Sequence, residues 1–345
     1  MEAKAYAILA EGQKLEPFTV ERRAPDAEDI LIELMYCGIC HTDLIIGNNE
    51  GGLAMYPVVP GHEMVGRVSE VGADVSGFTV GELVGVGCIA DSCRSCNPCE
   101  SGDEQYCDSG FTLSFNAMDS AGEKTFGGYS SHYTVNQRYA VKLPDGLDPA
   151  AAAPLLCGGI TVYSPLKRFG AGPGMKVGVL GLGGLGHLAI KMSKAMGAHT
   201  VMLTSSPSKV EDAEKLGADE VVLTSNEEDL QAQAFSFDLI INTISGPHNP
   251  DSFLTMLKRE GNMCFVGAPQ TPIPVTISNL IVGDKIMSGS LIGGMPSTSE
   301  MLEFCAEHGI TADIEMIAIE NVNEAWDRIE KNDVKYRFVI DLSSL

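Results

Sequence analysis

The segment Gly181-Leu-Gly-Gly-Leu-Gly186 constrains the fold of this 345-residue chain more than any other feature. It directly follows the apolar run Lys176–Leu180 and precedes His187–Met196, an apolar stretch typical of a helix. Glycines at this spacing permit a tight turn, a close approach of Gly183 to a pyrophosphate, and packing of the helix on the strand at Gly186. In this context the motif predicts a dinucleotide site, and a glycine turn without a ligand is the weaker interpretation.

Apolar runs downstream continue the alternation of strand and helix. They predict strands at 200–204, 220–223, 239–243, 263–266 and 288–292, with helical stretches between most of them. Such an alternation is typical of a parallel sheet wound on both faces by helices. After it, the pattern predicts helices near 299–307 and 323–331 and a final strand at 337–342.

The part of the chain before this region has a different sequence pattern. Between Lys4 and Leu143, short apolar runs such as 29–36 and 133–143 are broken by Gly, Pro and Asp, which is typical of a β-rich domain. An Ala/Pro-rich helix start follows at 148–154. We therefore predict an α/β protein with a β-rich domain at 1–149, a cofactor domain at 150–285, and a return segment at 286–345 that completes the sheet and the first domain.

The residues after the second predicted strand indicate which dinucleotide binds. An acidic residue there would hold the ribose 2′-hydroxyl of NAD, but this chain has Thr204-Ser-Ser-Pro-Ser-Lys209. Hydroxyl groups and an ammonium group suit a 2′-phosphate, which a carboxylate would repel. NADP(H) is therefore favoured, although these serines can also cap the helix that begins near Ser208.

Four cysteines lie close together in the pattern Cys93-x2-Cys96-x2-Cys99-x7-Cys107. This spacing lets one loop fold around a tetrahedral ion, and four thiolates leave no open position, so the pattern predicts a structural zinc site. Cys37-x2-Cys40 resembles a redox pair, but no thioredoxin-like βαβ unit surrounds it. Isolated cysteines are more often small core residues, and we assign that role to Cys37, Cys88, Cys264 and Cys305.

Charge and hydropathy exclude several classes of partner. The chain has 46 acidic and 23 basic residues, for a formal charge of −23, which disfavours nucleic acid and anionic membranes. No apolar run is long enough for a membrane span, and the start shows no secretory leader. These observations predict a cytoplasmic enzyme.

Seven ordered segments together resemble the zinc-containing medium-chain dehydrogenase/reductase superfamily, particularly its branch of cinnamyl alcohol dehydrogenase-like, NADP-dependent aldehyde reductases. They are Gly38-Ile-Cys-His-Thr-Asp43, Val59-Pro-Gly-His-Glu63-x2-Gly66, the four-cysteine loop, Phe126-Gly-Gly-Tyr129, Leu156-Cys-Gly-Gly-Ile-Thr161, Gly181-Leu-Gly-Gly-Leu-Gly-His187 and Tyr336-Arg-Phe-Val339. The resemblance covers essentially the whole chain. It implies a GroES-like catalytic domain, a Rossmann cofactor domain, and hydride transfer between primary alcohols and aldehydes.

The resemblance also implies a catalytic zinc bound by Cys40, His62 and Cys157, with Glu63 beside it either as an alternating fourth ligand or as a neighbour that does not bind the ion directly. With the structural site, this makes two zinc ions per chain. Thr42 corresponds to the hydroxyl that passes a proton between the reacting oxygen and the cofactor ribose. Many relatives have a histidine three residues later, where this chain has Ile45, so the end of the relay is open between a water chain and His41.

The remaining site residues follow from the same resemblance and from the glycine motif. For the cofactor they are His41, Thr161, Gly181, Gly183, Gly184, Leu185, Gly186, Thr204, Ser205, Ser206, Lys209, Thr243, Gly267, Ser290, Ile292 and Arg337. For an apolar substrate pocket they are Leu53, Tyr56, Leu113, Phe115, Leu280 and Ile292. The sequence near Leu113 departs from the lignin-type enzymes, so both aliphatic and aromatic aldehydes remain candidate substrates.

Two other functions compete with this prediction. A polyol or secondary-alcohol dehydrogenase of the same superfamily would usually prefer NAD and have an acidic residue near Ser205. A catalytically silent NADP-binding zinc protein would not need the complete set of Cys40, His62 and Cys157. In relatives, the apolar segment 286–292 pairs across a two-fold axis, so we also expect a homodimer.

Overall fold

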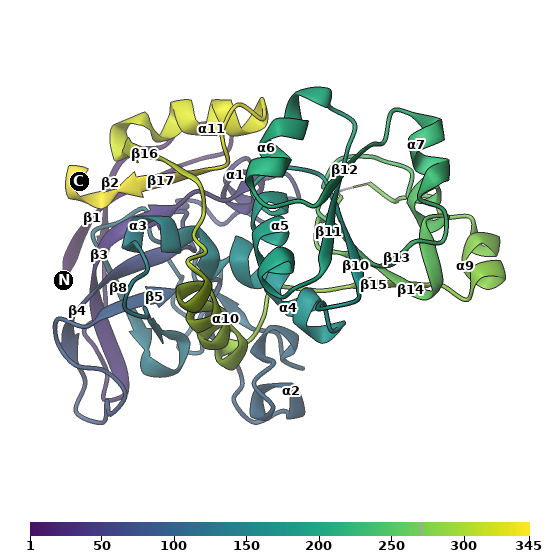
Figure 1. Ribbon diagram of the computed structural model, residues 1–345. Helices are drawn as coiled ribbons and strands as arrows, with labels where there is room; N and C mark the ends of the chain where they lie inside the picture. Colours follow the sequence, from purple (N-terminus) through teal and green to yellow (C-terminus); the bar gives the residue numbers. More distant parts are fainter. Residues whose placement is uncertain (270) are drawn as a thin grey trace. The chain divides into compact units, whose positions relative to one another are not determined.

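The computed structural model describes residues 1–269 and 271–345, which form two compact units (Figure 1). The first unit combines Met1–Ile160 with Gly293–Leu345, and the second is Thr161–Ile292. Within the described residues, no helix is both long and apolar enough to cross a membrane.

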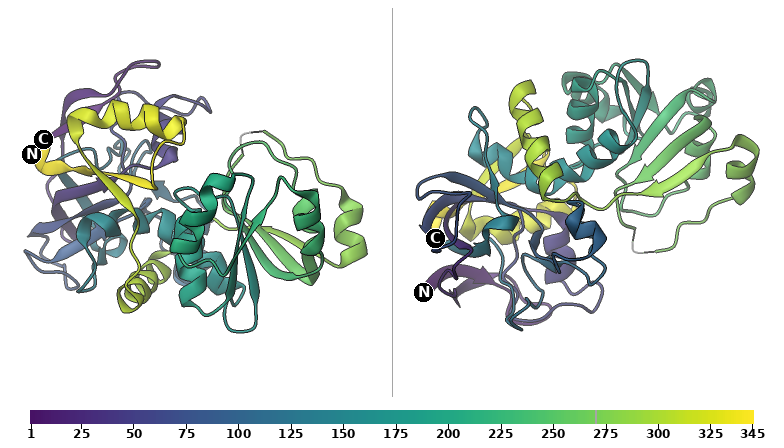
Figure 2. Two further views of the ribbon diagram at one scale, coloured as in Figure 1. Left: turned by 45° about the horizontal axis from the view of Figure 1, so that its top comes forward. Right: turned by 90° about the horizontal axis from the view of Figure 1, so that it is seen from below.

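The second unit contains a parallel sheet with strand order β12-β11-β10-β13-β14-β15. The strands are β10 Lys176–Leu180, β11 His199–Thr204, β12 Glu220–Leu223, β13 Phe237–Asn242, β14 Leu257–Phe265 and β15 Ile286–Gly289. The helices are α4 Gly158–Arg168, which begins at the end of the first unit, α5 Gly186–Ala195, α6 Val210–Lys215, α7 Glu227–Ala232, α8 Asp251–Leu254 and α9 Ile277–Gly283. Figure 2 shows the strands side by side with helices flanking them.

The core of this unit explains why the apolar runs were readable as strands. Leu180, Val201, Leu203 and Ile240 come from three neighbouring strands and are all buried in one cluster. In a parallel sheet both faces are covered, so the strands are continuously apolar rather than alternating. The predicted doubly wound parallel sheet is therefore present.

Two predicted strands differ from the observed strands by three or more residues at one end. β14 begins at Leu257 and not at Met263. The prediction missed the first half of the strand because residues 258–261 are Lys-Arg-Glu-Gly and interrupt the apolar pattern. The strand predicted at 288–292 is β15, which begins at Ile286 and ends at Gly289. Its neighbour β14 ends at Phe265, opposite Gly289, so the following backbone has no partner to continue the ladder, and Ile292 adopts a positive φ of 31°.

The first unit contains a mixed sheet with strand order β16-β17-β3-β4-β5-β9, in which β8 also pairs with β3. Its strands are β3 Asp29–Gly38, β4 Met64–Val71, β5 Leu83–Val86, β8 His132–Asn136, β9 Val141–Lys142, β16 Ile314–Ala318 and β17 Arg337–Asp341, and the shorter sheets contain β1 Glu2–Ala7, β2 Glu16–Glu21, β6 Ile89–Asp91 and β7 Thr112–Leu113. Its helices are α1 His41–Gly47, α2 Asn97–Glu100, α3 Pro149–Ala152, α10 Met295–His308 and α11 Val322–Glu330. The apolar run 133–143 is thus divided between β8 and β9.

The end of the chain is built into this first unit. β17 pairs antiparallel with β3, and β16 extends the sheet beyond β17. The two termini lie near each other in Figure 2, and the Lys4 ammonium donates to the backbone oxygen of Leu345 over 2.8 Å. Residues from both ends of the sequence therefore surround the site described next.

Candidate active site

Four side chains from three separate segments meet in the first unit. Cys40 follows β3, His62 and Glu63 precede β4, and Cys157 precedes α4. One ligand atom from each lies within 4.8 Å of the others, and the sulfur atoms of Cys40 and Cys157 are 3.9 Å apart. Two zinc–sulfur bonds of about 2.3 Å at a tetrahedral angle would separate the sulfur atoms by about 3.8 Å. The geometry of the donor set therefore fits a zinc ion.

A buried carboxylate orients the imidazole of this group. Asp43 Oδ1 lies 2.9 Å from Nδ1 of His62 and accepts the backbone N–H of Gly61 over 3.0 Å. Asp43 Oδ2 accepts the backbone N–H of Cys40 over 3.0 Å. An Nδ1–H directed at Asp43 leaves Nε2 as the metal ligand, a common arrangement of a second carboxylate behind a zinc-bound histidine. We did not predict Asp43, although its place three residues after Cys40, at the start of a helix, is a readable capping signal.

Glu63 forms a buried ion pair with Arg337. The Glu63 carboxylate is fully buried and accepts from the Arg337 guanidinium, whose side chain is 7% exposed. Burial raises the pKa of Glu63 to about 7, against the opposing effect of Arg337. The second oxygen of Glu63 has no hydrogen-bond partner among the described residues. Gly38 makes room for this carboxylate, because a Cβ on Gly38 would overlap Glu63.

The thiols of Cys40 and Cys157 form a hydrogen bond that shifts their pKa values in opposite directions. A hydrogen bond with Cys157 holds the pKa of Cys40 well below its usual value, and the same bond raises the pKa of Cys157. Burial, the largest single effect, favours the neutral form of His62, but the charges of Asp43, Cys88 and Cys40 and the hydrogen bond to Asp43 together outweigh it and raise the pKa of His62. We predicted Cys88 only as a core residue. It is buried, but its thiol also hydrogen-bonds to Cys157, so it belongs to the surroundings of this site.

The residues predicted for the proton relay lie on α1. The Thr42 hydroxyl is 3.7 Å from the Cys40 sulfur, and the side chain is exposed within its unit. His41 opens the same helix and is exposed, while Ile45 is half-buried one turn later. The structure thus brings Thr42 to the edge of the metal group.

The predicted pocket residues fall into two sets. Phe115 is buried and stacks on the His62 ring, with centroids 5.6 Å apart and an interplanar angle of 8°, and Leu113 lies just before it in β7. Leu53 is exposed, and the Tyr56 hydroxyl donates to the backbone oxygen of Gly47 over 3.0 Å. Leu280 and Ile292 belong to the second unit, where Leu280 packs against the core cluster and Ile292 is buried.

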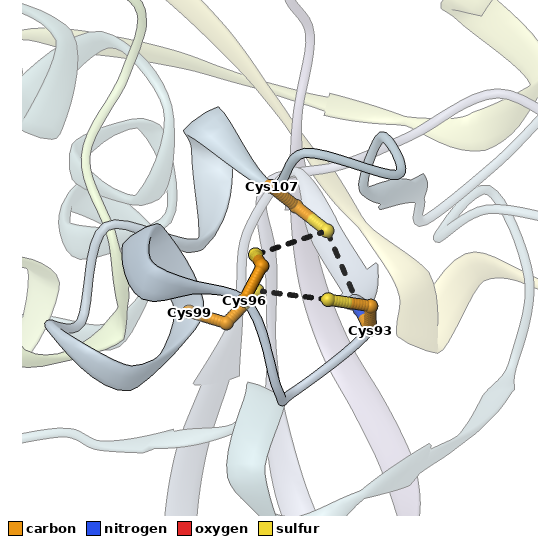
Figure 3. A group of neighbouring side chains, drawn as sticks. All are labelled: Cys93, Cys96, Cys99 and Cys107. Carbon is orange, nitrogen blue, oxygen red and sulfur yellow. Dashed lines mark hydrogen bonds between the residues drawn. The ribbon is translucent and has the colours of Figure 1, made fainter.

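The four-cysteine loop forms a second metal-ligand group (Figure 3). The sulfur atoms of Cys93 and Cys99 are 3.9 Å apart, as are those of Cys96 and Cys107. Figure 3 shows the sulfur atoms of the four side chains facing one another. The backbone N–H of Cys93 donates to the Cys107 sulfur over 3.4 Å, and that of Asp108 donates to the Cys96 sulfur over 3.5 Å. This group also fits a tetrahedral zinc ion.

In the second unit, the glycine turn connects β10 to α5. Gly181 has a φ of 96°, and a Cβ on Gly186 would overlap the backbone oxygen of Gly181. Gly183 has open space where a Cβ would be. Each glycine therefore meets the steric requirement that the motif implies, and Gly184 and Leu185 complete the turn.

The other predicted cofactor residues of this unit gather mainly at the carboxyl ends of parallel strands, where such sheets bind ligands. Thr204 ends β11, Ser205 and Ser206 follow it, Thr243 follows β13, Gly267 follows β14, and Ser290 and Ile292 follow β15, whereas Thr161 lies in α4. The Lys209 ammonium donates to the backbone oxygen of Leu182 over 2.6 Å, so its charge lies beside the glycine turn. Thr243 donates to the backbone oxygen of Leu180 over 2.9 Å.

Comparison with known proteins identifies the family of this chain. Residues 26–145 match the family described as "Alcohol dehydrogenase GroES-like domain", and residues 184–307 match "Zinc-binding dehydrogenase". The chain is 51% identical to aldehyde reductase YahK of Escherichia coli, over 100% of this chain and 99% of that protein. It is 46% identical to NADP-dependent alcohol dehydrogenase C 1 of Mycolicibacterium smegmatis, over 99% of this chain and 98% of that protein.

A solved cinnamyl alcohol dehydrogenase from Sorghum bicolor superposes with a TM-score of 0.96 and 43% identity, covering 99% of this chain and 98% of that one. The chain therefore belongs to the zinc-containing alcohol dehydrogenase family. It is a zinc-dependent oxidoreductase of alcohols and aldehydes, and the predicted family, fold class and activity are confirmed.

Proposed function

We propose that this enzyme reduces apolar aldehydes to primary alcohols with NADPH and holds two zinc ions per chain, one catalytic and one structural. The observation that carries the proposal is the buried group of Cys40, His62 and Cys157, in which Glu63 is paired with Arg337. With Glu63 held by Arg337, three protein ligands leave a fourth position for the substrate oxygen.

When bound, zinc supplies Lewis-acid polarisation of the carbonyl and NADPH supplies the hydride. The protein holds the reacting groups in place. The Cys40 and Cys157 sulfur atoms and Nε2 of His62 form the metal-binding face, with Asp43 fixing the imidazole. The Thr42 hydroxyl lies beside the Cys40 sulfur, where it would donate a proton to the substrate oxygen and would accept one in return from a hydroxyl of the bound cofactor.

The choice of NADP(H) over NAD(H) rests on the carboxyl end of β11. Residues 204–209 contain no acidic side chain. Ser205 and Ser206 offer hydroxyl groups, and Lys209 brings an ammonium group beside the glycine turn. These groups suit a 2′-phosphate, and the NADP dependence named for the Mycolicibacterium relative agrees with this assignment. The same reasoning disfavours a polyol dehydrogenase that uses NAD.

We assign the substrate as an apolar aldehyde, aliphatic or aromatic, because the Phe115 ring stacks on His62 of the metal group and Leu113 precedes it by two residues. We assign residues 1–149 with the return segment 286–345 to the catalytic domain and residues 150–285 to cofactor binding, with Cys157 near the start of the latter range joining the catalytic metal group. Among the described residues, none of the ten cysteines forms a disulfide bond, which agrees with a reducing, cytoplasmic location.

The test is to follow NADPH and, separately, NADH absorbance with a panel of aliphatic and aromatic aldehydes. The proposal expects fast oxidation of NADPH by apolar aldehydes, slower oxidation of NADH, and loss of activity in Cys40→Ser and Cys157→Ser. Cys264→Ser, a buried cysteine of the second unit, is the matched control. Zinc-loaded protein that oxidises neither cofactor with any aldehyde would contradict the proposal and favour a silent NADP-binding protein.

We also propose a homodimer formed through the outer edge of the second unit. β15 is the last strand of its sheet, and Ile286 on it is exposed. On nearby α9, Ile281 and Val282 are 74% and 87% exposed. A second copy of the chain can cover these apolar side chains and continue the sheet. Light scattering should give twice the chain mass for wild type and one chain mass for Val282→Asp, with the exposed Val80→Asp as control.

A further inference from the structure

Tyr129 has no place in the chemistry above, although it ends the segment Phe126-Gly-Gly-Tyr129, one of those that carry the family resemblance. Its side chain is fully buried. Its hydroxyl donates to Oδ2 of Asp43 over 3.3 Å and accepts from Nε1 of Trp326 over 3.4 Å. Tyr129 therefore connects helix α11 to the carboxylate behind the metal group.

In this series of hydrogen bonds, Asp43 is the residue that contacts the metal ligands. Oδ1 lies against Nδ1 of His62 and the backbone N–H of Gly61, and Oδ2 accepts the backbone N–H of Cys40. The Asp43 carboxylate thus holds the orientation of the His62 ring and the position of the Cys40 backbone. The hydrogen bonds to both oxygens hold the orientation of the Asp43 carboxylate, and the Tyr129 hydroxyl is a side-chain donor to Oδ2.

Trp326 supports the same arrangement from the other end. It lies in α11, and its indole also packs against α1, because a Cβ on Gly47 would lie 2.6 Å from Cη2 of the ring. α1 carries Thr42 and Asp43. The indole N–H can donate but not accept, so Tyr129 must accept from Trp326 and direct its own proton to Asp43.

The protonation of Tyr129 agrees with this direction. Burial, together with the charge of Asp43, raises the pKa of Tyr129 well above its usual value. The phenol is therefore neutral near pH 7 and can donate its proton to Asp43.

We propose that Tyr129 is a positioning residue for the catalytic metal site, and that Trp326 fixes the Tyr129 hydroxyl so that Asp43 holds His62 and Cys40 in the metal-binding geometry. The inference rests on the proposed function in one respect, namely that His62 and Cys40 bind zinc. It adds that α11, in the C-terminal segment, controls how firmly that zinc is held.

The predicted effect of Tyr129→Phe is faster loss of the catalytic zinc. The variant keeps the ring and its packing and removes the donor to Asp43. Groups behind a zinc ligand typically contribute about 10- to 100-fold to metal affinity, so we expect release to accelerate within that range. Release from the four-cysteine loop should not change, because Tyr129 does not contact it.

The experiment measures zinc content and zinc release to a chromogenic chelator from the intact holoenzyme. Cys157→Ser, which lacks one catalytic ligand, identifies the catalytic phase. Tyr133→Phe is the matched control, because Tyr133 is also buried and its hydroxyl donates to the backbone oxygen of Ser114 over 2.9 Å. Melting temperatures of all variants are recorded alongside.

Wild-type protein with one zinc ion per chain would contradict the proposed function, independently of Tyr129. If wild type holds two zinc ions and Tyr129→Phe releases the catalytic one within about twofold of the wild-type rate, the inference is wrong, even if the melting temperature falls. Trp326→Phe should accelerate release in wild type but add nothing in the Tyr129→Phe background, because both act through one hydroxyl. Full additivity of the two substitutions would remove Trp326 from the proposal.

Discussion

Replacing Glu63 with glutamine should destabilise the first unit strongly. Glu63 is fully buried and Arg337 is 7% exposed, so the substitution leaves a buried guanidinium without its counter-charge. Breaking a buried ion pair on one side typically costs about 3–5 kcal/mol in the free energy of unfolding. Cys40 and Cys157 also favour the Arg337 cation, but Glu63 has the larger charge effect and is the partner hydrogen-bonded to it.

Urea unfolding of the zinc-loaded protein measures this cost. The chain has one tryptophan, Trp326, which is buried in the first unit, so its fluorescence reports on the unfolding of that unit. With a slope of about 3 kcal/mol per molar urea, the expected loss moves the midpoint down by about 1–2 M.

A double-mutant cycle separates the ion pair from simple loss of packing. Arg337→Met keeps most of the volume, and the double variant Glu63→Gln with Arg337→Met removes both charges. Because an apolar pair can replace a buried ion pair at little cost, the double variant should be more stable than the sum of the single changes implies. A midpoint shift below about 0.3 M for Glu63→Gln would refute the reasoning, since it would mean that the pair contributes little.

Three further results are expected. Cys93→Ser should lower the zinc content from two ions per chain to one and reduce the melting temperature, whereas Cys305→Ser should keep both ions, as measured by elemental analysis. Lys209→Ala should raise the KM for NADPH by about 10- to 100-fold, the value of one charge-assisted hydrogen bond, and change the KM for NADH much less. Gly186→Ala should impair folding, because a Cβ there would overlap the Gly181 backbone oxygen, whereas Gly183→Ala, with open space around it, should fold normally and bind cofactor poorly in a fluorescence titration.

Local sequence patterns were sufficient to predict the glycine turn and the four-cysteine loop. In each case the residues are close in the chain, so a few backbone angles decide their arrangement. Gly181 has the positive φ that a tight turn requires, and the sulfur atoms of Cys93–Cys107 meet as their spacing predicts. The apolar strands β10 and β12 were equally readable because each is a short, continuous run.

The exact end of β15 was not readable, because the strand stops where its neighbour stops. Leu291 and Ile292 beyond the strand are apolar, and nothing in the local composition shows that β14 ends at Phe265. Cys88 was assigned to packing for a similar reason. Its spacing does not reveal that it contacts Cys157, which lies far away in the sequence.

The sequence by itself determined the two motifs whose parts are neighbours in the chain, and the resemblance then indicated which distant residues should join them. The tertiary structure alone decided how those residues are supported. β17 pairs with β3 in the register Val339 opposite Gly38, which brings Arg337 to Glu63, and α11 brings Trp326 to Tyr129 and through it to Asp43. These contacts join the two ends of the chain, and their partners are chosen by strand register and helix packing, which no local run of residues specifies.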